Sequence, residues 1–233
     1  SGDPFPYSTN PKVVAAVVKL AQERGAHRVI VGDRSNPGYD TLDAMKKSGI
    51  HDAALASGAE VMDVGSEGYR KVQPLGATHW PEGFRLANVL FNNVHHVINL
   101  PTCKDHFLAN FTMSIKAWMG LIAQADRSTA HDDLGNRLPE LHLGLPQTFA
   151  ILDATRAWLT GGPFTGGEQA APGLVVASAD PIACDVTGLA ILKRYLKKGQ
   201  IPNPRIESKT VWSQPQIVRA MQIGIGISNR SDY

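Results

Sequence analysis

The chain has 233 residues, of which 43% are hydrophobic and 19% are charged. This length suits one large α/β domain, and the composition excludes a disordered or fibrous protein. The formal net charge is +2, from 23 basic and 21 acidic residues without a long basic run, so no nucleic-acid partner is indicated. No stretch reaches the roughly 20 apolar residues of a membrane-spanning helix. Two cysteines, Cys103 and Cys184, are too few for an iron–sulfur motif or a four-cysteine zinc site.

The first expected elements are a helix and a strand. Asn10 is a capping residue, and Pro11 occupies the first helical position, where its missing N–H costs nothing. Apolar residues then recur with helical spacing until Gly25. Residues 28–31 are typical of a buried strand, which Asp33 follows closely. The chain starts without an initiator methionine or a signal peptide, so we expect a missing preceding segment, and both a cytoplasmic and an exported location stay open.

The next part of the chain mixes short helices, strands and a polar section. Residues 65–85 are rich in glycine and proline, which predicts a subsidiary ribbon or lid with an antiparallel edge strand near 71–75. The other elements expected before residue 100 are helices at 40–47, 50–57 and 86–91 and strands at 59–64 and 94–100.

The stretch 99–120 carries the densest polar chemistry of the chain. Pro101 breaks the preceding apolar strand, and the residues that follow are predicted to form a loop at its C-terminal end, where open α/β sheets bind ligands. A helix is expected from 111 to 123, so Thr112 and Lys116 share one of its faces. The candidate ligand-binding and catalytic side chains of this stretch are Lys104, His106, Thr112, Ser114 and Lys116.

The second half repeats the alternation of strand and helix. A polar loop at 126–133 contains His131, and a helix is expected at 139–145. The other expected elements are a strand at 149–152 ending at Asp153, a strand at 174–177, a helix that begins at Pro181 and carries Asp185, capped by Asp180, and a helix at 216–221. This order predicts a single α/β domain over residues 1–233, with a mainly parallel sheet covered by helices on both faces.

Five candidate side chains each follow a predicted strand, which favours a common crevice. Each also has a simpler interpretation, because aspartates often form turns or helix caps and lysines often only face solvent. As ligands, the lysines supply point charges for a carboxylate or phosphate. The five residues are Asp33, Lys104, His106, Asp153 and Asp180.

Histidine is the strongest catalytic candidate among these residues. The imidazole of His106 suits proton transfer near neutral pH or metal ligation, although a hydrogen-bonded core histidine is the simpler alternative. His131, in a polar loop, is a second candidate metal ligand or base, and surface exposure is its alternative. Carboxylates beside histidines would suit a divalent metal ion as cofactor.

The segment from Asn99 to His106, followed by Thr112, Lys116 and Gly120, resembles the family called domain of unknown function 362. Its members carry Asn-Leu-Pro, Lys-x-His, a threonine, a helix lysine and a glycine in this order. Further matching blocks are Val31-Gly32-Asp33, Asp153 near Gly161-Gly162-Pro163, and Ala177-Ser178-Ala179-Asp180-Pro181 with Asp185.

Three departures from the family pattern are visible. Ala117 stands where the family tends to have asparagine, and the family's opening Lys-Pro-Asn strand and the ferredoxin-like cysteine motifs of some members are absent. The resemblance also implies that export through the twin-arginine route occurs in some members.

The order His106, Lys116, His131 is similar to that of nickel-pincer lactate racemases. This similarity implies that Lys116 would hold a cofactor, that His131 would ligate the metal, and that His106 would act as an acid or base.

Two functions from different classes follow. The first is a protein that binds a small anionic ligand, cofactor or metal in a crevice at the C-terminal strand ends, with acid–base or redox chemistry by histidine and lysine. The second is a non-catalytic accessory or structural subunit of a redox or secreted assembly, with a protein partner or a second copy on its surface.

Overall fold

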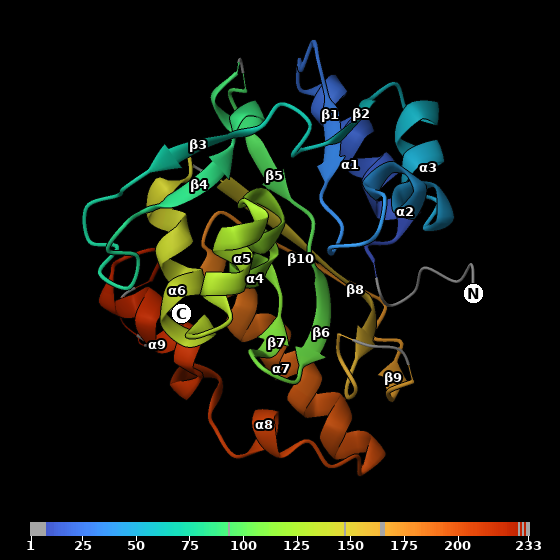
Figure 1. Ribbon diagram of the computed structural model, residues 1–233. Coiled ribbons are helices and arrows are strands. Elements are labelled where there is room, and N and C mark those ends of the chain that lie inside the picture. The colour runs from blue at the N-terminus through green and yellow to red at the C-terminus, as the bar shows by residue number, and fades with distance from the viewer. Residues whose placement is uncertain are drawn as a thin grey trace.

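The computed structural model describes residues 8–92, 94–146, 148–163 and 166–227, together with 229 and 231. Helices pack around a mixed β-sheet, and a smaller lobe built from the first part of the chain lies beside it (Figure 1). Within the described residues, no helix combines the length and the apolar character that crossing a membrane requires. The predicted α/β class is confirmed.

The N-terminal lobe has its own small core. Its elements are α1 (Pro11–Glu23), β1 (Ile30–Asp33), α2 (Thr41–Lys47), α3 (Ile50–Ala56) and β2 (Glu60–Asp63), with β1 and β2 paired in parallel. The side chain of Asn10 accepts a hydrogen bond from the Lys12 N–H at 2.9 Å, as its capping position predicted. The buried side chains of this core are Val14, Val18, Met45, Ile50, Ala54 and Ala59.

The predicted ribbon is confirmed. Strands β3 (Tyr69–Val72) and β4 (Phe84–Ala87) pair antiparallel and lead into a 3-10 helix, η1 (Asn88–Phe91). Phe84 and Leu86 are almost completely buried in the main core. The ribbon is therefore packed against the body of the protein through one of its strands.

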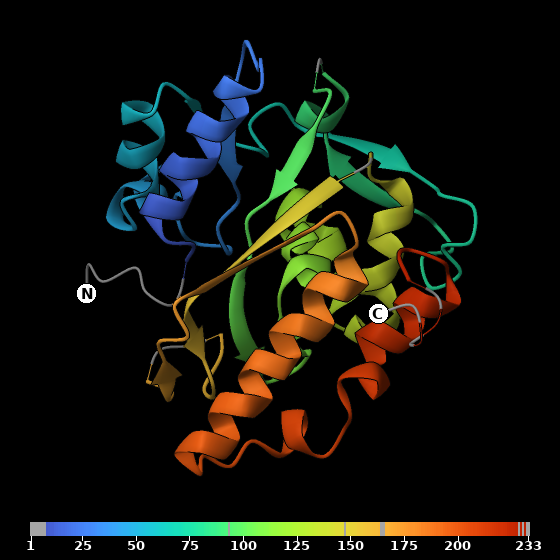
Figure 2. The same cartoon turned by 180° about the vertical axis from the view of Figure 1, so that it is seen from behind.

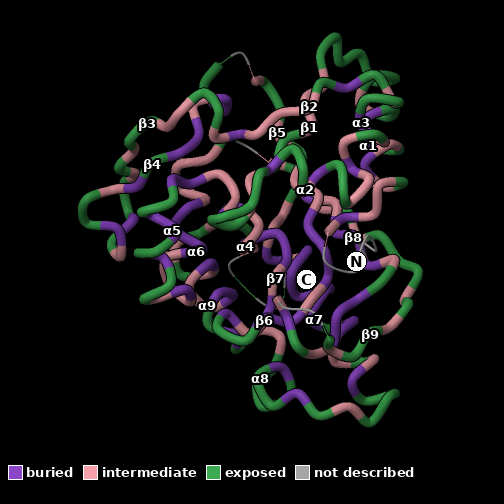
Figure 3. Tube along the Cα trace, turned by 45° about the vertical axis from the view of Figure 1, so that its right-hand side comes forward, coloured by how far each residue is buried: buried purple, intermediate pink, exposed green. Residues whose placement is uncertain are grey.

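The main sheet is organised around β8 (Thr148–Trp158). Parallel pairing joins β5 (Val97–Asn99) and β6 (Thr102–His106) to β8. Antiparallel pairing adds β7 (Asn110–Thr112) to β6, and β9 (Gln169–Ala170) and β10 (Leu174–Ser178) to β8. The buried segments in Figure 3 run through the centre of the molecule around β6, β8 and α7 (Pro181–Gly199).

Figures 1 and 2, seen from opposite sides, show α4, α5 and α6 on one side of the molecule and α7 on the other. The helices after β7 are α4 (Ser114–Ala117), η2 (Trp118–Leu121), α5 (Gln124–Ala130), α6 (Leu134–Leu141) and η3 (His142–Gly144), and those after α7 are α8 (Pro204–Glu207), η4 (Val211–Ser213) and α9 (Pro215–Gln222).

Part of one sheet face is open to solvent. Ile98 pairs with Phe149, and strand alternation places Val175 on the same face, opposite the side where Leu152 packs against α7. These three side chains are 41%, 40% and 51% exposed. Helices therefore leave this apolar patch uncovered within the described part of the chain.

Several local predictions were wrong. The helix expected from 111 to 123 is broken, because Thr112 ends strand β7 and Lys116 lies on the short helix α4, so the two do not share a helix face. The segment expected as a helix at 86–91 begins in strand β4 and continues as the 3-10 helix η1.

The expected loop after Pro101 is strand β6, because a register shift between Thr102 and Cys103 lets pairing with β8 resume after the proline. The expected polar loop at 126–133 is largely helix α5, whose buried face carries the charged residues Asp126 and Arg127. Asp153 lies in the middle of β8 rather than after its end.

A fully buried carboxylate, that of Glu140 on α6, joins the C-terminal helix α9 to the loop before β4. It accepts hydrogen bonds from the backbone N–H of His79 at 2.8 Å and from Nδ1 of the same residue at 2.7 Å, and it pairs with Arg219. These donors hold the pKa of Glu140 below its usual value, although burial alone would raise it.

We expect Glu140→Ala to lower the free energy of unfolding by roughly 3–5 kcal/mol, because the guanidinium of Arg219 would stay buried without its carboxylate. Urea unfolding measures this loss. The exposed Glu23→Ala is the control and should change stability by less than about 0.5 kcal/mol. Equal effects of the two substitutions would contradict a structural role for Glu140.

Candidate functional site

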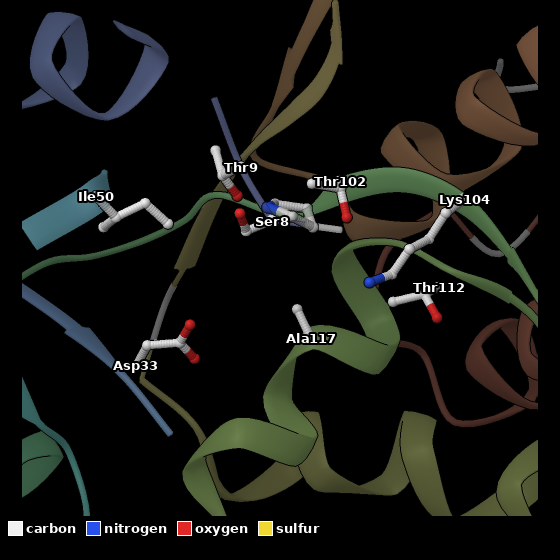
Figure 4. Close-up of a pocket in the computed structure, with 9 residues that line it drawn as sticks. Ser8, Thr9, Asp33, Ile50, Thr102, Lys104, Thr112 and Ala117 are labelled. Atoms are coloured by element: carbon white, nitrogen blue, oxygen red, sulfur yellow. The ribbon is translucent and has the colours of Figure 1, made fainter. Parts of the chain in front are cut away.

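A small cavity lies between the N-terminal lobe and the β6–β7 hairpin (Figure 4). Its volume is about 190 Å³, below the 300–1,000 Å³ typical of sites for drug-sized ligands. A site between two packed units is a common place for a ligand. The residues that line it are Ser8, Thr9, Asp33, Ile50, Pro101, Thr102, Lys104, Thr112 and Ala117.

The hairpin places Lys104 and Thr112 side by side. They are direct partners in the antiparallel register of β6 and β7. Figure 4 shows the Lys104 ammonium reaching across the cavity toward the lobe. Burial lowers the pKa of Lys104, whereas the nearby carboxylates of Asp33 and Asp105 oppose that shift. The hydroxyl of Thr112 is buried and has no hydrogen-bond partner among the described residues.

Asp33 lies at the end of β1, as the sequence predicted. From there it faces the hairpin. One carboxylate oxygen, Oδ1, accepts the N–H of Arg34 at 2.7 Å. Asp33 is exposed to solvent, and partial desolvation by the protein around it raises the pKa of its carboxyl. The positive charges of Arg127 and Lys104 oppose the rise.

Lys116 lies on α4, next to the cavity residue Ala117. Burial, together with the nearby positive charges of Lys104 and Arg127, lowers the pKa of the half-buried ammonium to about 8. Within the described part of the chain, Lys116 has neither a hydrogen bond nor an ion pair for its ammonium. The two charged groups that shift the pKa of Lys116 are thus both cations.

Arg127 completes this group of cations, and the sequence analysis missed its role. Its guanidinium donates to the backbone carbonyls of Ser35, Gly120 and Ile122, and it forms no ion pair with a carboxylate among the residues that the structure describes. It is 6% exposed. A charged residue on the apolar face of a helix could have signalled this role, but the segment was expected to be a loop.

Ser114 and Asp185 contact each other rather than the cavity. The fully buried carboxylate of Asp185 accepts hydrogen bonds from the Ser114 N–H at 2.7 Å, from its hydroxyl at 2.6 Å, and from the Ile115 N–H at 3.1 Å. Burial raises the pKa of Asp185 to about 7, against the effect of these donors. Asp185 thereby fixes the start of α4 and with it the position of Lys116.

Asp153 and Asp180 also hold the fold together. Asp153 accepts the N–H of Asn10 at 2.7 Å and both the N–H and the hydroxyl of Thr155, which ties α1 to β8. Asp180 caps α7 through the Ala183 N–H at 2.9 Å and accepts the Ile227 N–H at 2.6 Å. Neither carboxylate lines the cavity. The capping role of Asp180 was expected, and ligand binding by either residue stays a prediction.

His106 closes the turn of the β6–β7 hairpin. Its Nδ1 accepts the backbone N–H groups of Leu108 at 3.2 Å and Ala109 at 3.1 Å. The side chain is 4% exposed, and burial together with nearby Lys116 and Lys104 lowers its pKa to about 3. The ring is therefore neutral at physiological pH and carries its proton on Nε2. Its proposed acid–base role stays a prediction.

His131 lies exposed at the C-terminal end of α5, with its Nδ1 2.7 Å from the carbonyl oxygen of Arg127. The structure, over the residues that it describes, contains no group of three or more histidine, cysteine, aspartate or glutamate residues able to hold a metal ion. The metal site expected from His106 and His131 thus gains no third protein ligand there, and it stays a prediction.

Asp185 should make stability depend on pH. Its pKa is about 7 in the folded protein against 3.8 ordinarily, so the folded state binds a proton that the unfolded state lacks between those values. Wild-type stability should therefore fall relative to Asp185→Asn as pH rises from 4 to 7, by at most about 1.4 kcal/mol per pH unit. Urea unfolding across this range tests it, and a stability difference independent of pH would refute it.

Comparison with known proteins places the chain in a family. A thylakoid-associated protein of Synechocystis sp. is 27% identical over 192 residues, which are 79% of this chain and 57% of that protein. The chain thus spans little more than half the length of this relative. No solved structure matches it. The family model described as domain of unknown function (DUF362) matches residues 1–190. The chain therefore belongs to the family called domain of unknown function 362.

Proposed function

We propose that the chain binds a small anionic ligand in the cavity between the N-terminal lobe and the β6–β7 hairpin. Lys104 would contact the anion directly, because its ammonium projects into the cavity (Figure 4). Lys116 and Arg127 do not line the cavity, but they would add positive charge from nearby. Charged hydrogen bonds and desolvated cations of this kind are the usual means of holding a carboxylate or phosphate.

The observation that carries the proposal is the surplus of cations. Lys116 interacts electrostatically with two further cations, Lys104 and Arg127, and among the described residues the one carboxylate that lines the cavity is that of Asp33. A desolvated ammonium without a counter-charge, such as that of Lys116, is costly to the folded protein. An anion in the cavity would offset this cost, which supports a binding role over a purely structural one.

For chemistry beyond binding, the structure supports a reactive role for Lys116 better than one for His106. A neutral, hydrogen-bonded His106 fits a structural role, whereas Lys116, with its pKa near 8, keeps a share of reactive neutral amine at physiological pH. The cofactor-holding role implied for Lys116 thus stays within the proposal. The alternative of a non-catalytic accessory subunit stays a prediction, to which the open patch of Ile98, Phe149 and Val175 is relevant.

Titration with phosphate, acetate and malonate at constant ionic strength tests the proposal by calorimetry and by thermal unfolding. We expect at least one anion to bind saturably and to lose about tenfold or more in affinity in Lys104→Met, because a charged hydrogen bond is lost. The exposed Lys12→Met is the matched control and should bind like the wild type. Equal loss in both variants, or no saturable binding to the wild type, would refute the proposal.

The affinity should also depend on pH through Lys116. The ammonium of the free protein loses its proton around pH 8, so anion binding should weaken as pH rises from 7 to 9. This additional weakening should be absent from Lys116→Met, whose side chain does not titrate. Calorimetric titrations of the two proteins at pH 7, 8 and 9 measure the difference, and parallel pH profiles would rule out this role of Lys116.

A further inference from the structure

We infer that the ligand carries, besides its anionic group, a hydrogen-bond donor that Asp33 accepts. This inference rests on the proposed function and specifies the class of ligand that the same cavity would take. The class is that of small anions with a hydroxyl or ammonium group a short distance from the negative charge.

The cavity has a negatively charged group on one wall and a positively charged group on the opposite wall. Figure 4 shows the carboxylate of Asp33 and the ammonium of Lys104 pointing toward each other from opposite walls. The two belong to different units of the fold, β1 of the lobe and β6 of the main sheet. A ligand between them therefore meets a donor at one end and an acceptor at the other.

Asp33 has unused hydrogen-bonding capacity. Its Oδ1 accepts the Arg34 N–H, and no residue that the structure describes donates to its Oδ2. The neighbouring carboxylate of Asp63 differs, because both of its oxygens accept hydrogen bonds from Arg34. A simple anion placed against Lys104 would leave Asp33 facing negative charge, which costs free energy in a partly desolvated site. A ligand with a donor removes that conflict.

The size of the cavity limits how far the two groups can be separated. A volume of about 190 Å³ matches a small metabolite. Thr102 supports such a ligand, since Figure 4 shows its hydroxyl oxygen pointing between the two walls. The site thus fits a short molecule with both groups more closely than a long-chain or aromatic acid.

Two matched series of probes test the inference. The first is acetate, glycolate and glycine, and the second is methylphosphonate with its hydroxymethyl and aminomethyl counterparts. Each series keeps the anionic group and adds a hydroxyl or an ammonium. Calorimetry with wild type, Asp33→Ala and the exposed control Asp43→Ala gives the affinities.

In at least one series, we expect one of the two probes with a hydroxyl or ammonium group to bind about tenfold more tightly than the simple anion. The gain comes from one hydrogen bond to the charged carboxylate of Asp33. That advantage should vanish in Asp33→Ala and persist in Asp43→Ala. Equal binding of all members, or an advantage that survives in Asp33→Ala, would overturn the inference while leaving anion binding intact. No saturable binding by these probes or by phosphate and malonate would overturn the proposed function as well.

Discussion

The buried carboxylate of Asp185 is the contact on which the arrangement of the site depends. It takes three hydrogen bonds from Ser114 and Ile115, at the first turn of α4. A helix of four residues has no stability of its own, because nucleation is costly and few internal hydrogen bonds form. Long helix α7 supplies the rigid support, and the position of Lys116 beside the cavity follows from this one contact.

The positive charges around the cavity are unfavourable for the folded protein. Lys104, Lys116 and Arg127 are partly or largely desolvated, and their mutual repulsion lowers the pKa of Lys116. Proteins tolerate such local costs where binding needs them and compensate elsewhere. The guanidinium of Arg127 is partly satisfied by backbone carbonyls, and the fold gains stability elsewhere from contacts such as the ion pair of Glu140 with Arg219.

Much of the local structure was predictable because its signals lie close together in the sequence. The capped starts of α1 and α7 follow from Asn10-Pro11 and Asp180-Pro181, and each forms as expected. The ribbon of β3 and β4 was expected from its glycine- and proline-rich surroundings. Asp33 was placed at a strand end and lies there, because a short apolar run bounded by Gly32 needs no distant information.

The long-range features were not predictable in the same way. The strand β6 exists because β8, more than forty residues later, provides its hydrogen-bonding partner after a bulge. Helix α5 was missed because its buried face carries Asp126 and Arg127, whose partners Arg85 and Ser35 come from distant parts of the chain. Residue propensities and hydrophobic periodicity carry no information about which distant segments of the chain pair with each other.

The sequence by itself determined the α/β class, the capped helices, the polar character of the stretch 99–120 and, through the resemblance, the family. Only the tertiary structure decided which polar residues meet. It brings Asp33, Lys104 and Thr112 to one cavity, and it gives Asp153, Asp180 and Asp185 hydrogen bonds that hold helices and strands in place. The reason is physical: a carboxylate after a strand can cap a helix, receive backbone donors or face a ligand, and the choice depends on which N–H groups the folded chain brings within hydrogen-bonding distance.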